Sequence, residues 1–568
     1  MSYILGIHTG HTSTASIMLD GKIISCISEE RLVRVKEQGG FPRKAITEVL
    51  DVAGITPSDV DHVSIAGFLE PVTSFTNRGD NWFRRLYKNS SFVIPKKVFQ
   101  SSSITKRAAK AVGRNRHKIS SELKSLGILT EDIRYYDHHD CHASTAYNLS
   151  GFSESLVLTC DGGGDGLCAT IQIGKNGILE KCVEISQYNS IGRFYSAITE
   201  YLGMKPLSHE YKVMGLAAYS KPEHVQNVYD KLRKIIVIDP KNPLKFINVS
   251  GIHPSNYLSY FHKLLKYERF DNISSAVQLV TEDLLTTWVR NAVKTYGFKH
   301  LCLAGGVFMN VKANQKILEL DEVDSLFIMP SCGDESVGIG ASILHSTDIE
   351  VDINPIKSIY FGREYDEEYY KNTINDLDKN KYSIEYREDI NSYAGEKLSE
   401  GLIIGRHNGP MEFGARALGN RSILTDPRNL SSVSKINEAI KNRDFWMPFT
   451  PSVLNEDINK YINNPKNHFA PYMIMTFDTK AKGKEDLPAA VHQKDHTTRP
   501  QMVKKDWNSG YHELISSFKK ETGVSASLNT SFNLHGYPIV NSPEDSIYVF
   551  NNSDLDALAI GNYFVTKK

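Results

Sequence analysis

The sequence predicts an α/β protein of at least two domains, and three observations support this. The chain has 568 residues, which is too long for a single hydrophobic core. Short apolar strands alternate with Gly-rich turns and helical segments along most of its length. A strand, a small-residue turn and a hairpin open the chain, and the same layout returns after residue 154. The repetition indicates an internal duplication.

The composition restricts the class of partner and the compartment. Lys plus Arg equals Asp plus Glu at 66 each, so net charge gives no support to a nucleic-acid partner. No apolar run reaches membrane-spanning length, and the N-terminus has the pattern of a strand rather than of a signal peptide. The seven cysteines contain no C-x-x-C pair. We therefore expect reduced thiols in a cytoplasmic protein.

The first segment predicts a sheet with a polar turn. Residues 3–7 form an apolar strand that leads into a His/Thr/Gly/Ser turn at 8–13. Residues 15–31 predict two strands around an Asp20-Gly21 turn, which is a strong hairpin pattern. Residues 41–54 predict a helix that ends at a glycine. The small turn residues allow backbone N–H groups to approach an anion, and the segment resembles the phosphate-binding opening of actin-like ATPase folds.

A basic stretch follows between residues 84 and 118, with aromatic residues among its lysines and arginines. Two interpretations stay open. The stretch is either a solvated helical insertion or a surface that binds an acidic or nucleotide-like acceptor.

Three histidines and two carboxylates lie within residues 137–142. His138 and His142 are four positions apart, so they share one face of a helix and can hold one metal ion. Imidazole with carboxylate suits zinc or ferrous iron, and a further acidic ligand must come from elsewhere. Asp334, in a Gly-rich turn after a strand, is the first candidate and Asp161 the second. The alternative is a cluster of surface or helix-capping histidines.

Polar and Gly-rich segments elsewhere indicate anion-binding sites. A His-Glu-x-x-Lys set ends at Lys212, and a Gly305-Gly306 turn precedes a helix that carries Asn310. Such a turn can point helix N–H groups at an anion. Residues 405–422 are dense in glycine and arginine, which suits phosphate binding, whereas surface ion pairs are the alternative. A polar stretch at 348–355 predicts a boundary between domains 1–352 and 353–568.

Ten motifs together resemble the NodU/CmcH family of O-carbamoyltransferases. They occur in family order and run from the first strand almost to the C-terminus. The motifs are EERLVRVKEQGGFP, HHDCHAS, DGGGDG, EYKVMGLAAY, LAGGVFMN, SCGDESVGIGAS, MEFGARALGNRSILTDPR, MPFTPSVL, TRPQMV and SLNTSFNLHGYPIV. The resemblance implies a duplicated actin-like, TsaD-like N-terminal domain that bears the metal, followed by a YrdC-like α/β domain.

The resemblance also implies a two-stage reaction. Carbamoyl phosphate and ATP, with Mg²⁺, give carbamoyl-adenylate in the C-terminal domain. An acceptor hydroxyl then attacks this anhydride in the N-terminal domain, where Fe(II) or another divalent ion such as Zn²⁺ is bound. Adenylation supplies the good leaving group that carbamate lacks.

The resemblance assigns roles to individual residues. His11 is the base that deprotonates the acceptor hydroxyl, a role that suits a neutral imidazole. The implied metal ligands are His138, His142, Asp334 and Asp161. The candidate contacts of the nucleotide or carbamoyl-adenylate are Lys212, Gly305, Gly306 and Asn310. The implied carbamoyl phosphate site is Arg416, Lys441 and Arg499, with Arg421, Arg443, Ser531 and Asn533 as neighbours.

Several points stay open at this stage. Many family members have Arg in the loop where this chain has His535, so the contribution of that loop to phosphate binding is undecided. The acceptor is not specified: a natural product, a sugar or a nucleoside would each use the same core. The alternatives are threonylcarbamoylation of tRNA and a catalytically silent nucleotide-binding regulator. The oligomeric state is equally open, with a homodimer among the options.

Overall fold

The computed structural model describes residues 2–69, 100–103, 106–107, 116–441 and 444–568. Contacts divide the chain into two compact units. Unit 1 comprises residues 1–29 and 37–356, and unit 2 comprises residues 30–36 and 357–568. The predicted basic stretch at 84–118 lies largely outside the described residues, and so does Arg443.

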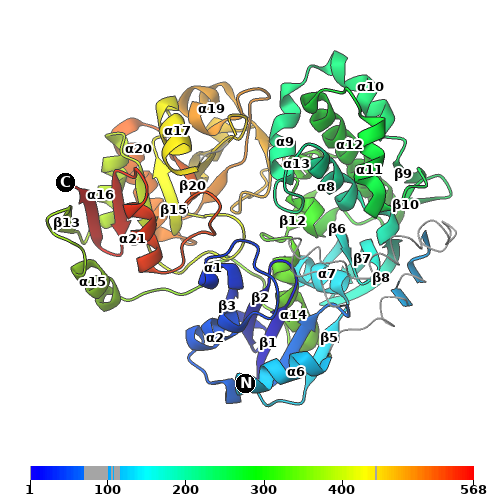
Figure 1. Cartoon of the computed structure of the whole chain (residues 1–568), viewed down its shortest axis with the longest axis horizontal. Helices are drawn as coiled ribbons and strands as arrows, with labels where there is room; N and C mark the ends of the chain where they lie inside the picture. The colour runs from blue at the N-terminus through cyan, green and yellow to red at the C-terminus, as the bar shows by residue number, and fades with distance from the viewer. Residues whose placement is uncertain (1, 70–99, 104–105, 108–115, 442–443) are drawn as a thin grey trace. The chain divides into compact units, whose positions relative to one another are not determined.

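Unit 1 contains two five-stranded sheets with the same strand pattern (Figure 1). In each, three antiparallel strands are followed by two parallel ones. The first sheet, in the order β3-β2-β1-β4-β5, consists of β1 (Tyr3–His8), β2 (Thr14–Leu19), β3 (Lys22–Ser28), β4 (His62–Ala66) and β5 (Ile133–Tyr136). The second, β8-β7-β6-β11-β12, consists of β6 (Glu154–Gly164), β7 (Leu167–Lys175), β8 (Ile178–Ser186), β11 (His300–Ala304) and β12 (Ser325–Ile328).

Local sequence explains the first hairpin. β2 and β3 are joined by Asp20 and Gly21, which both have positive φ, 46° and 75°. Such a pair matches the right-handed twist of the flanking strands, and Asp-Gly adopts it at low cost. The predicted hairpin is therefore confirmed. The predicted helix at 41–54 is also present, as α2 (Arg43–Val52), which buries Ala45, Ile46, Val49 and Leu50 on one face.

Two helices of unit 1 link its sheets. α7 (His138–Asn148) packs against β6, β7 and β11 of the second sheet. α14 (Val337–Asp348) packs against β1, β2, β4 and β5 of the first sheet. The two helices also contact each other, so they form the layer between the sheets. Gly340 allows this close approach, because an added Cβ would come 2.0 Å from the Cys141 carbonyl oxygen of α7.

The remaining elements of unit 1 are mainly helical. They are α1 (Glu29–Val33), which runs into residues of unit 2, α6 (Arg116–Ser125), α8 (Ile191–Tyr201), α9 (Glu210–Leu216), α10 (Pro222–Leu232), α11 (Tyr257–Leu264), α12 (Phe270–Tyr296), α13 (Val311–Leu318) and the hairpin of β9 (Ile236–Asp239) and β10 (Asn242–Asn248). α12 is amphipathic and buries Trp288 against Phe246 of β10. Within the described ranges, no helix has the length and apolar content needed to cross a membrane.

Unit 2 is built on one eight-stranded mixed sheet. Its order is β13-β22-β21-β14-β15-β20-β16-β19. The strands are β13 (Tyr382–Tyr386), β14 (Ile404–His407), β15 (Arg421–Thr425), β16 (Thr450–Leu454), β19 (Gln501–Val503), β20 (Ala526–Ser531), β21 (Ala557–Ile560) and β22 (Tyr563–Lys567). The helices are α15 (Glu367–Asn375), α16 (Ile390–Ser399), α17 (Leu430–Ile436), α18 (Ile458–Tyr461), α19 (Ala481–Asp486), α20 (Ser509–Thr522) and α21 (Pro543–Asn551), and a small ladder joins β17 (Phe477–Asp478) to β18 (Thr497–Thr498). Both units are thus mixed α/β, as predicted.

Residues 30–36 belong to unit 2 although they follow the first hairpin of unit 1 in sequence. Arg31 is 3% exposed, and its guanidinium donates to the Gly414 carbonyl. Arg34 donates to the Ile539 and Pro538 carbonyls at 2.7 and 3.2 Å and pairs with Asp545 at 3.3 Å. The sequence pattern did not predict this exchange between the two units.

Candidate metal centre and anion site

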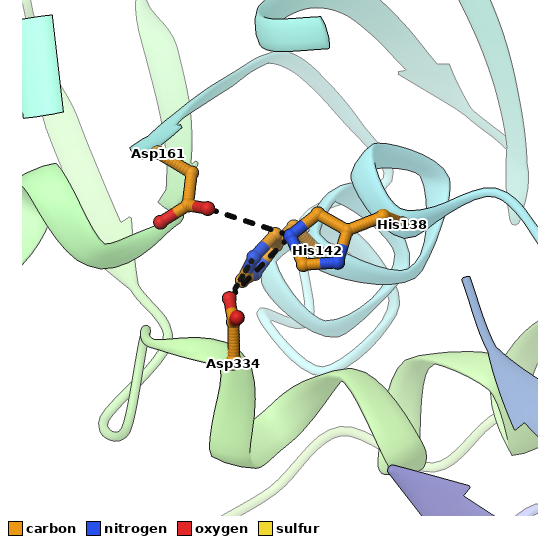
Figure 2. A group of neighbouring side chains, drawn as sticks. All are labelled: His138, His142, Asp161 and Asp334. Carbon is orange, nitrogen blue, oxygen red and sulfur yellow. Dashed lines mark ion pairs between the residues drawn. The ribbon is translucent and has the colours of Figure 1, made fainter. Parts of the chain in front are cut away.

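Four side chains of unit 1 converge on one point (Figure 2). His138 and His142 project from the first turns of α7, Asp161 from β6 and Asp334 from the turn after β12. The two histidines share one helix, and the two carboxylates come from later parts of the sequence. Each can offer one ligand atom, and these atoms lie within 4.8 Å of one another. The structure therefore brings together the four residues for which the sequence predicted a shared metal.

The separations fit a metal better than direct hydrogen bonds. His138 Nε2 lies 3.5 Å from Asp161 Oδ2 and 3.4 Å from Asp334 Oδ1. His142 Nε2 lies 3.3 Å from Asp334 Oδ1. Ligands bonded at about 2.0–2.1 Å in a tetrahedron are roughly 3.3–3.4 Å apart, whereas charged hydrogen bonds are about 2.7–2.9 Å long. Both Nε2 atoms and Asp334 Oδ1 are buried without a hydrogen-bond partner among the described residues.

Electrostatics point the same way. Burial opposes a charge on His138, but the Asp334 and Asp161 carboxylates overcome it and raise the pKa of His138 well above its usual value. Burial likewise works against ionised Asp334, yet the neighbouring histidines hold its pKa well below the usual range. A site that stabilises positive charge between two carboxylates is a site for a cation.

The backbone around α7 is fixed by two further carboxylates. Asp137 caps the helix and accepts hydrogen bonds from the His139 and Asp140 N–H groups at 3.0 and 3.2 Å. Asp165 accepts one from the His138 N–H at 2.9 Å and others from the Phe68 and Leu69 N–H groups at 2.9 Å. Sequence reasoning missed Asp165. Its position in a DGGGDG turn with φ of 47° was the available signal.

One glycine at the end of β6 makes room for the His138 ring. An added Cβ on Gly164 would come 2.2 Å from the His138 ring, whereas one on Gly162 would meet nothing within 4 Å. Gly164 thus allows strand β6 to approach His138, a candidate metal ligand.

His139 and His11 are the other histidines near this centre. His139 is fully buried, with Nδ1 2.8 Å from Thr159 Oγ1. Burial, together with the two neighbouring imidazoles, lowers its pKa to about 3, so it is a neutral packing residue. His11 lies in the turn between β1 and β2, with a 30% exposed side chain, and its Nδ1 is 3.7 Å from Asp334 Oδ2. His11 thus adjoins the carboxylate oxygen that faces away from the two ligand histidines.

The predicted nucleotide contacts lie in the turn after β11, at the start of α13 and on α9. The Gly306 N–H donates to Asp161 Oδ1 at 3.0 Å, and Gly305 has φ of 103°. The Asn310 side chain caps α13 through the Ala313 N–H and exchanges two hydrogen bonds with Gln278, at 2.9 and 3.0 Å. Lys212 lies on α9. The Gly305-Gly306 turn is therefore joined directly to the metal centre through Asp161.

In unit 2 the structure brings Lys441, Ser531 and Asn533 together. Lys441 is 3% exposed, and its Nζ donates to Asn533 Oδ1 at 2.5 Å, to the Asn533 carbonyl at 2.9 Å and to Ser531 Oγ at 3.3 Å. His535 is adjacent, with Nδ1 2.6 Å from the Lys441 carbonyl oxygen. The Ser531 and Asn533 oxygens thus fix the position of the Lys441 Nζ.

Arg416 and Arg499 lie on segments that meet near this group. The Ala417 carbonyl accepts a hydrogen bond from Asn529 Nδ2 at 3.2 Å, and Gln501 Oε1 lies 3.3 Å from the same nitrogen. Asn529 is two residues before Ser531 on β20. The residues that follow Arg416 and Arg499 therefore contact β20, the strand that ends at Ser531 beside Lys441.

Arg421 is placed differently. It is fully buried, and within the described residues its guanidinium donates to backbone carbonyls. It donates to the carbonyls of Asn541 (3.2 Å), Gly409 (3.0 Å), Asn420 (3.0 Å), Arg363 (3.3 Å) and Asn408 (3.4 Å). As a phosphate ligand, Arg421 would have to give up these bonds.

A buried centre of two histidines and two carboxylates in an α/β chain of two units defines the protein as a candidate metal-dependent enzyme. Residues 3–343 match the model of the carbamoyltransferase N-terminus, and residues 395–567 match that of the carbamoyltransferase C-terminus. The chain therefore belongs to the carbamoyltransferase family and is a carbamoyl-transferring enzyme. The resemblance drawn from the ten motifs is confirmed.

Relatives from three organisms illustrate the match. An uncharacterized protein of Methanocaldococcus jannaschii is 32% identical over 99% of both chains. Nodulation protein NolNO of Sinorhizobium fredii is 30% identical over 98% of this chain and 79% of its own length. The 3'-hydroxymethylcephem-O-carbamoyltransferase of Amycolatopsis lactamdurans is 26% identical over 50% of this chain and 53% of its own.

Proposed function

We propose that the protein is an ATP-dependent O-carbamoyltransferase that activates the carbamoyl group in unit 2 and transfers it to an acceptor hydroxyl in unit 1. One observation carries the proposal. A single chain of this family contains a candidate cation centre in unit 1 and a buried lysine site in unit 2. The acceptor is a small molecule that bears a hydroxyl group, such as a natural product, a sugar or a nucleoside.

The two units correspond to the proposed domain types. The repeated strand pattern of the two sheets in unit 1 supports a duplicated, actin-like TsaD-type domain. The mixed sheet of unit 2 is assigned to a YrdC-like domain. This division gives each chemical stage its own set of side chains.

In the first stage, water hydrolyses carbamoyl phosphate to carbamate and phosphate. A carbamate oxygen then attacks the α-phosphorus of ATP, which forms carbamoyl-adenylate and releases pyrophosphate. Lys441, Arg416 and Arg499 supply the positive charge that holds the phosphate groups, and Ser531 and Asn533 orient Lys441. Mg²⁺ accompanies the ATP. Charge-assisted contacts of this kind are the strongest that side chains offer to phosphate.

In the second stage, the acceptor oxygen attacks the carbamoyl carbon and AMP leaves. His11 takes the hydroxyl proton on a ring nitrogen, and its position beside Asp334 orients the ring. Asp161, held by the Gly306 N–H, links the Gly305-Gly306 turn to the centre, so that donor and metal ligands share one support. Lys212 and Asn310 are the proposed donor contacts from neighbouring helices.

The residues of the centre fit a divalent ion: His138, His142, Asp161 and Asp334 would hold it. Two imidazoles and two carboxylates suit Fe(II) or Zn²⁺. When bound, such an ion supplies Lewis-acid polarisation of the donor or acceptor oxygen.

The test is direct. The protein, loaded with Fe(II) or Zn²⁺, is incubated with carbamoyl phosphate, Mg²⁺-ATP and a panel of hydroxyl-bearing aminoglycosides, oligosaccharides and nucleosides. Mass spectrometry should find an acceptor that gains one carbamoyl group, with AMP formed in equal amount. Carbamoylation that proceeds equally well without ATP would refute the activation stage. Transfer that requires tRNA and threonine would instead identify the alternative activity.

A further inference from the structure

Unit 1 contains a second group of metal-ligand side chains, distinct from the centre at α7. His62 begins β4, Asp132 directly precedes β5, and His345 lies in the last turn of α14. Each can offer one ligand atom within 4.8 Å of the other two. His345 lies eight residues beyond the first residue of α14, roughly 12 Å along the helix axis. The group is thus remote from Asp334, which precedes the helix.

The distances within this group are compatible with a shared ion. His345 Nε2 lies 3.3 Å from Asp132 Oδ2, close to the separation of roughly 3.3–3.4 Å between ligands of a tetrahedral ion. His62 Nδ1 lies 2.7 Å from the same oxygen, so its ring would have to withdraw by about 0.6 Å to reach that separation. The His62 side chain is 22% exposed, so one side of it faces solvent. Two histidines and one carboxylate leave the remaining positions to water, as in many zinc and iron sites.

The surroundings would orient two of the three ligands, His345 and Asp132. Ser64 Oγ lies 2.9 Å from His345 Nδ1, so an ion on Nε2 leaves Nδ1–H to donate to the hydroxyl. Arg134 donates to both oxygens of Asp132, from Nε to Oδ1 at 2.9 Å and from Nη2 to Oδ2 at 3.1 Å, and thereby fixes the carboxylate. An ion on Oδ2 would share that oxygen with the guanidinium. Metal-ligating histidines and carboxylates are usually held by such secondary hydrogen bonds.

The local charge also permits a cation. Arg134 is the positive group beside Asp132, and Asp348 opposes it, with Oδ2 3.5 Å from Arg134 Nη1. Tyr136 donates its hydroxyl proton to the same Asp348 oxygen at 2.7 Å. With neutral histidines, His62, Asp132, His345, Arg134 and Asp348 together carry one net negative charge. A divalent ion would therefore be attracted rather than repelled.

We propose that His62, Asp132 and His345 form a second binding site for a divalent transition metal, with zinc favoured by the ligand set. The site ties the beginnings of β4 and β5 to the end of α14. It stabilises the sheet-to-helix packing of unit 1 and takes no part in carbamoyl transfer. The proposal does not depend on the proposed function, because the ligands and their test involve only metal binding.

The experiment uses the full chain with His142→Ala, which removes a ligand of the first centre. After chelation and dialysis, this variant is titrated with Zn²⁺ against a chromophoric chelator. We expect one zinc ion per chain, and the added variant His62→Ala should weaken its binding at least 100-fold. His300→Gln is the matched control, since His300 also begins a strand and contacts a serine, Ser325 Oγ at 2.6 Å, but does not belong to the group.

A second measurement separates lost ligation from misfolding. Zinc should raise the melting temperature of the His142→Ala protein and of its His300→Gln derivative, but not of the His62→Ala derivative. All of them should melt at similar temperatures in chelator, because the His62 side chain is partly exposed. The proposal is overturned if the His142→Ala protein binds no zinc, or if its one zinc ion is retained at unchanged affinity after His62→Ala.

Discussion

His142 Nε2 lies 3.3 Å from Asp334 Oδ1, and neither atom has a hydrogen-bond partner among the described residues. The two residues come from α7 and from the turn after β12, almost two hundred positions apart. A buried imidazole and carboxylate at this distance, without a direct hydrogen bond, are arranged as two ligands of one cation.

The end of strand β6 gives a matched pair of variants that tests this arrangement. Gly164→Ala should displace the His138 ring, because the new methyl group would lie 2.2 Å from it. We expect metal affinity to fall by roughly 10–100-fold, the usual effect of disturbing the support of a ligand. Gly162→Ala, whose methyl group meets nothing, should bind metal normally. Metal content after dialysis measures both, and equal metal content in the two variants would contradict the predicted clash.

Lys441 is expected to bind the phosphate of the carbamoyl donor. Lys441→Ala removes one charge-assisted contact, worth about 1.5–3 kcal/mol or roughly 10–150-fold in affinity. The KM for carbamoyl phosphate, followed by pyrophosphate release, should rise by this factor. Lys435→Ala serves as the control, because Lys435 pairs with Asp556 at an exposed position. A saturation curve that is unchanged in Lys441→Ala would remove this residue from the donor site.

Arg421 should affect stability rather than donor affinity. Arg421→Met would leave several buried carbonyls without their donor, and each unsatisfied group costs about 1–3 kcal/mol. We expect the free energy of unfolding of unit 2 to fall by roughly 2–4 kcal/mol, measured by urea denaturation. The KM for carbamoyl phosphate of the folded protein should stay the same. A large rise in that KM with normal stability would show that Arg421 does bind the donor.

His11 is expected to act on the acceptor. His11→Ala should keep metal and carbamoyl-adenylate formation, because His11 is neither a proposed ligand nor part of unit 2. Transfer should slow by roughly 10²–10⁴-fold, as expected for loss of a general base. Single-turnover transfer from preformed carbamoyl-adenylate measures this step, and a melting curve provides the control. If His11 only stabilises the turn, the melting temperature will fall while the transfer rate per folded molecule stays normal.

The sequence predicted much of unit 1 because its key signals are local. The Asp20-Gly21 hairpin follows from the φ values that these residues adopt cheaply. The i, i+4 spacing placed His138 and His142 on one face of α7. Pairing them with Asp161 and Asp334 rested on the Gly-rich turns in which both carboxylates lie and on the family resemblance.

Other features depend on packing that no local pattern reveals. The pattern of glycine and arginine at 405–422 could not distinguish an arginine that faces a ligand from one that faces carbonyls. Arg421 faces carbonyls because β15 pairs with β14 and β20 in a register that directs this side chain to the interior. The role of Asp165 and the exchange of residues 30–36 into unit 2 likewise depend on contacts between distant segments.

The division of labour between the two units is the central claim, and His142→Ala tests it most directly. The variant and the wild type are mixed with carbamoyl phosphate, Mg²⁺-ATP and an acceptor identified by mass spectrometry, and carbamoyl-adenylate and carbamoylated acceptor are quantified in a single turnover. The account predicts that His142→Ala loses the metal of the centre at α7, accumulates carbamoyl-adenylate and forms almost no carbamoylated acceptor. Loss of carbamoyl-adenylate formation in this variant, or normal transfer without metal, would contradict the account.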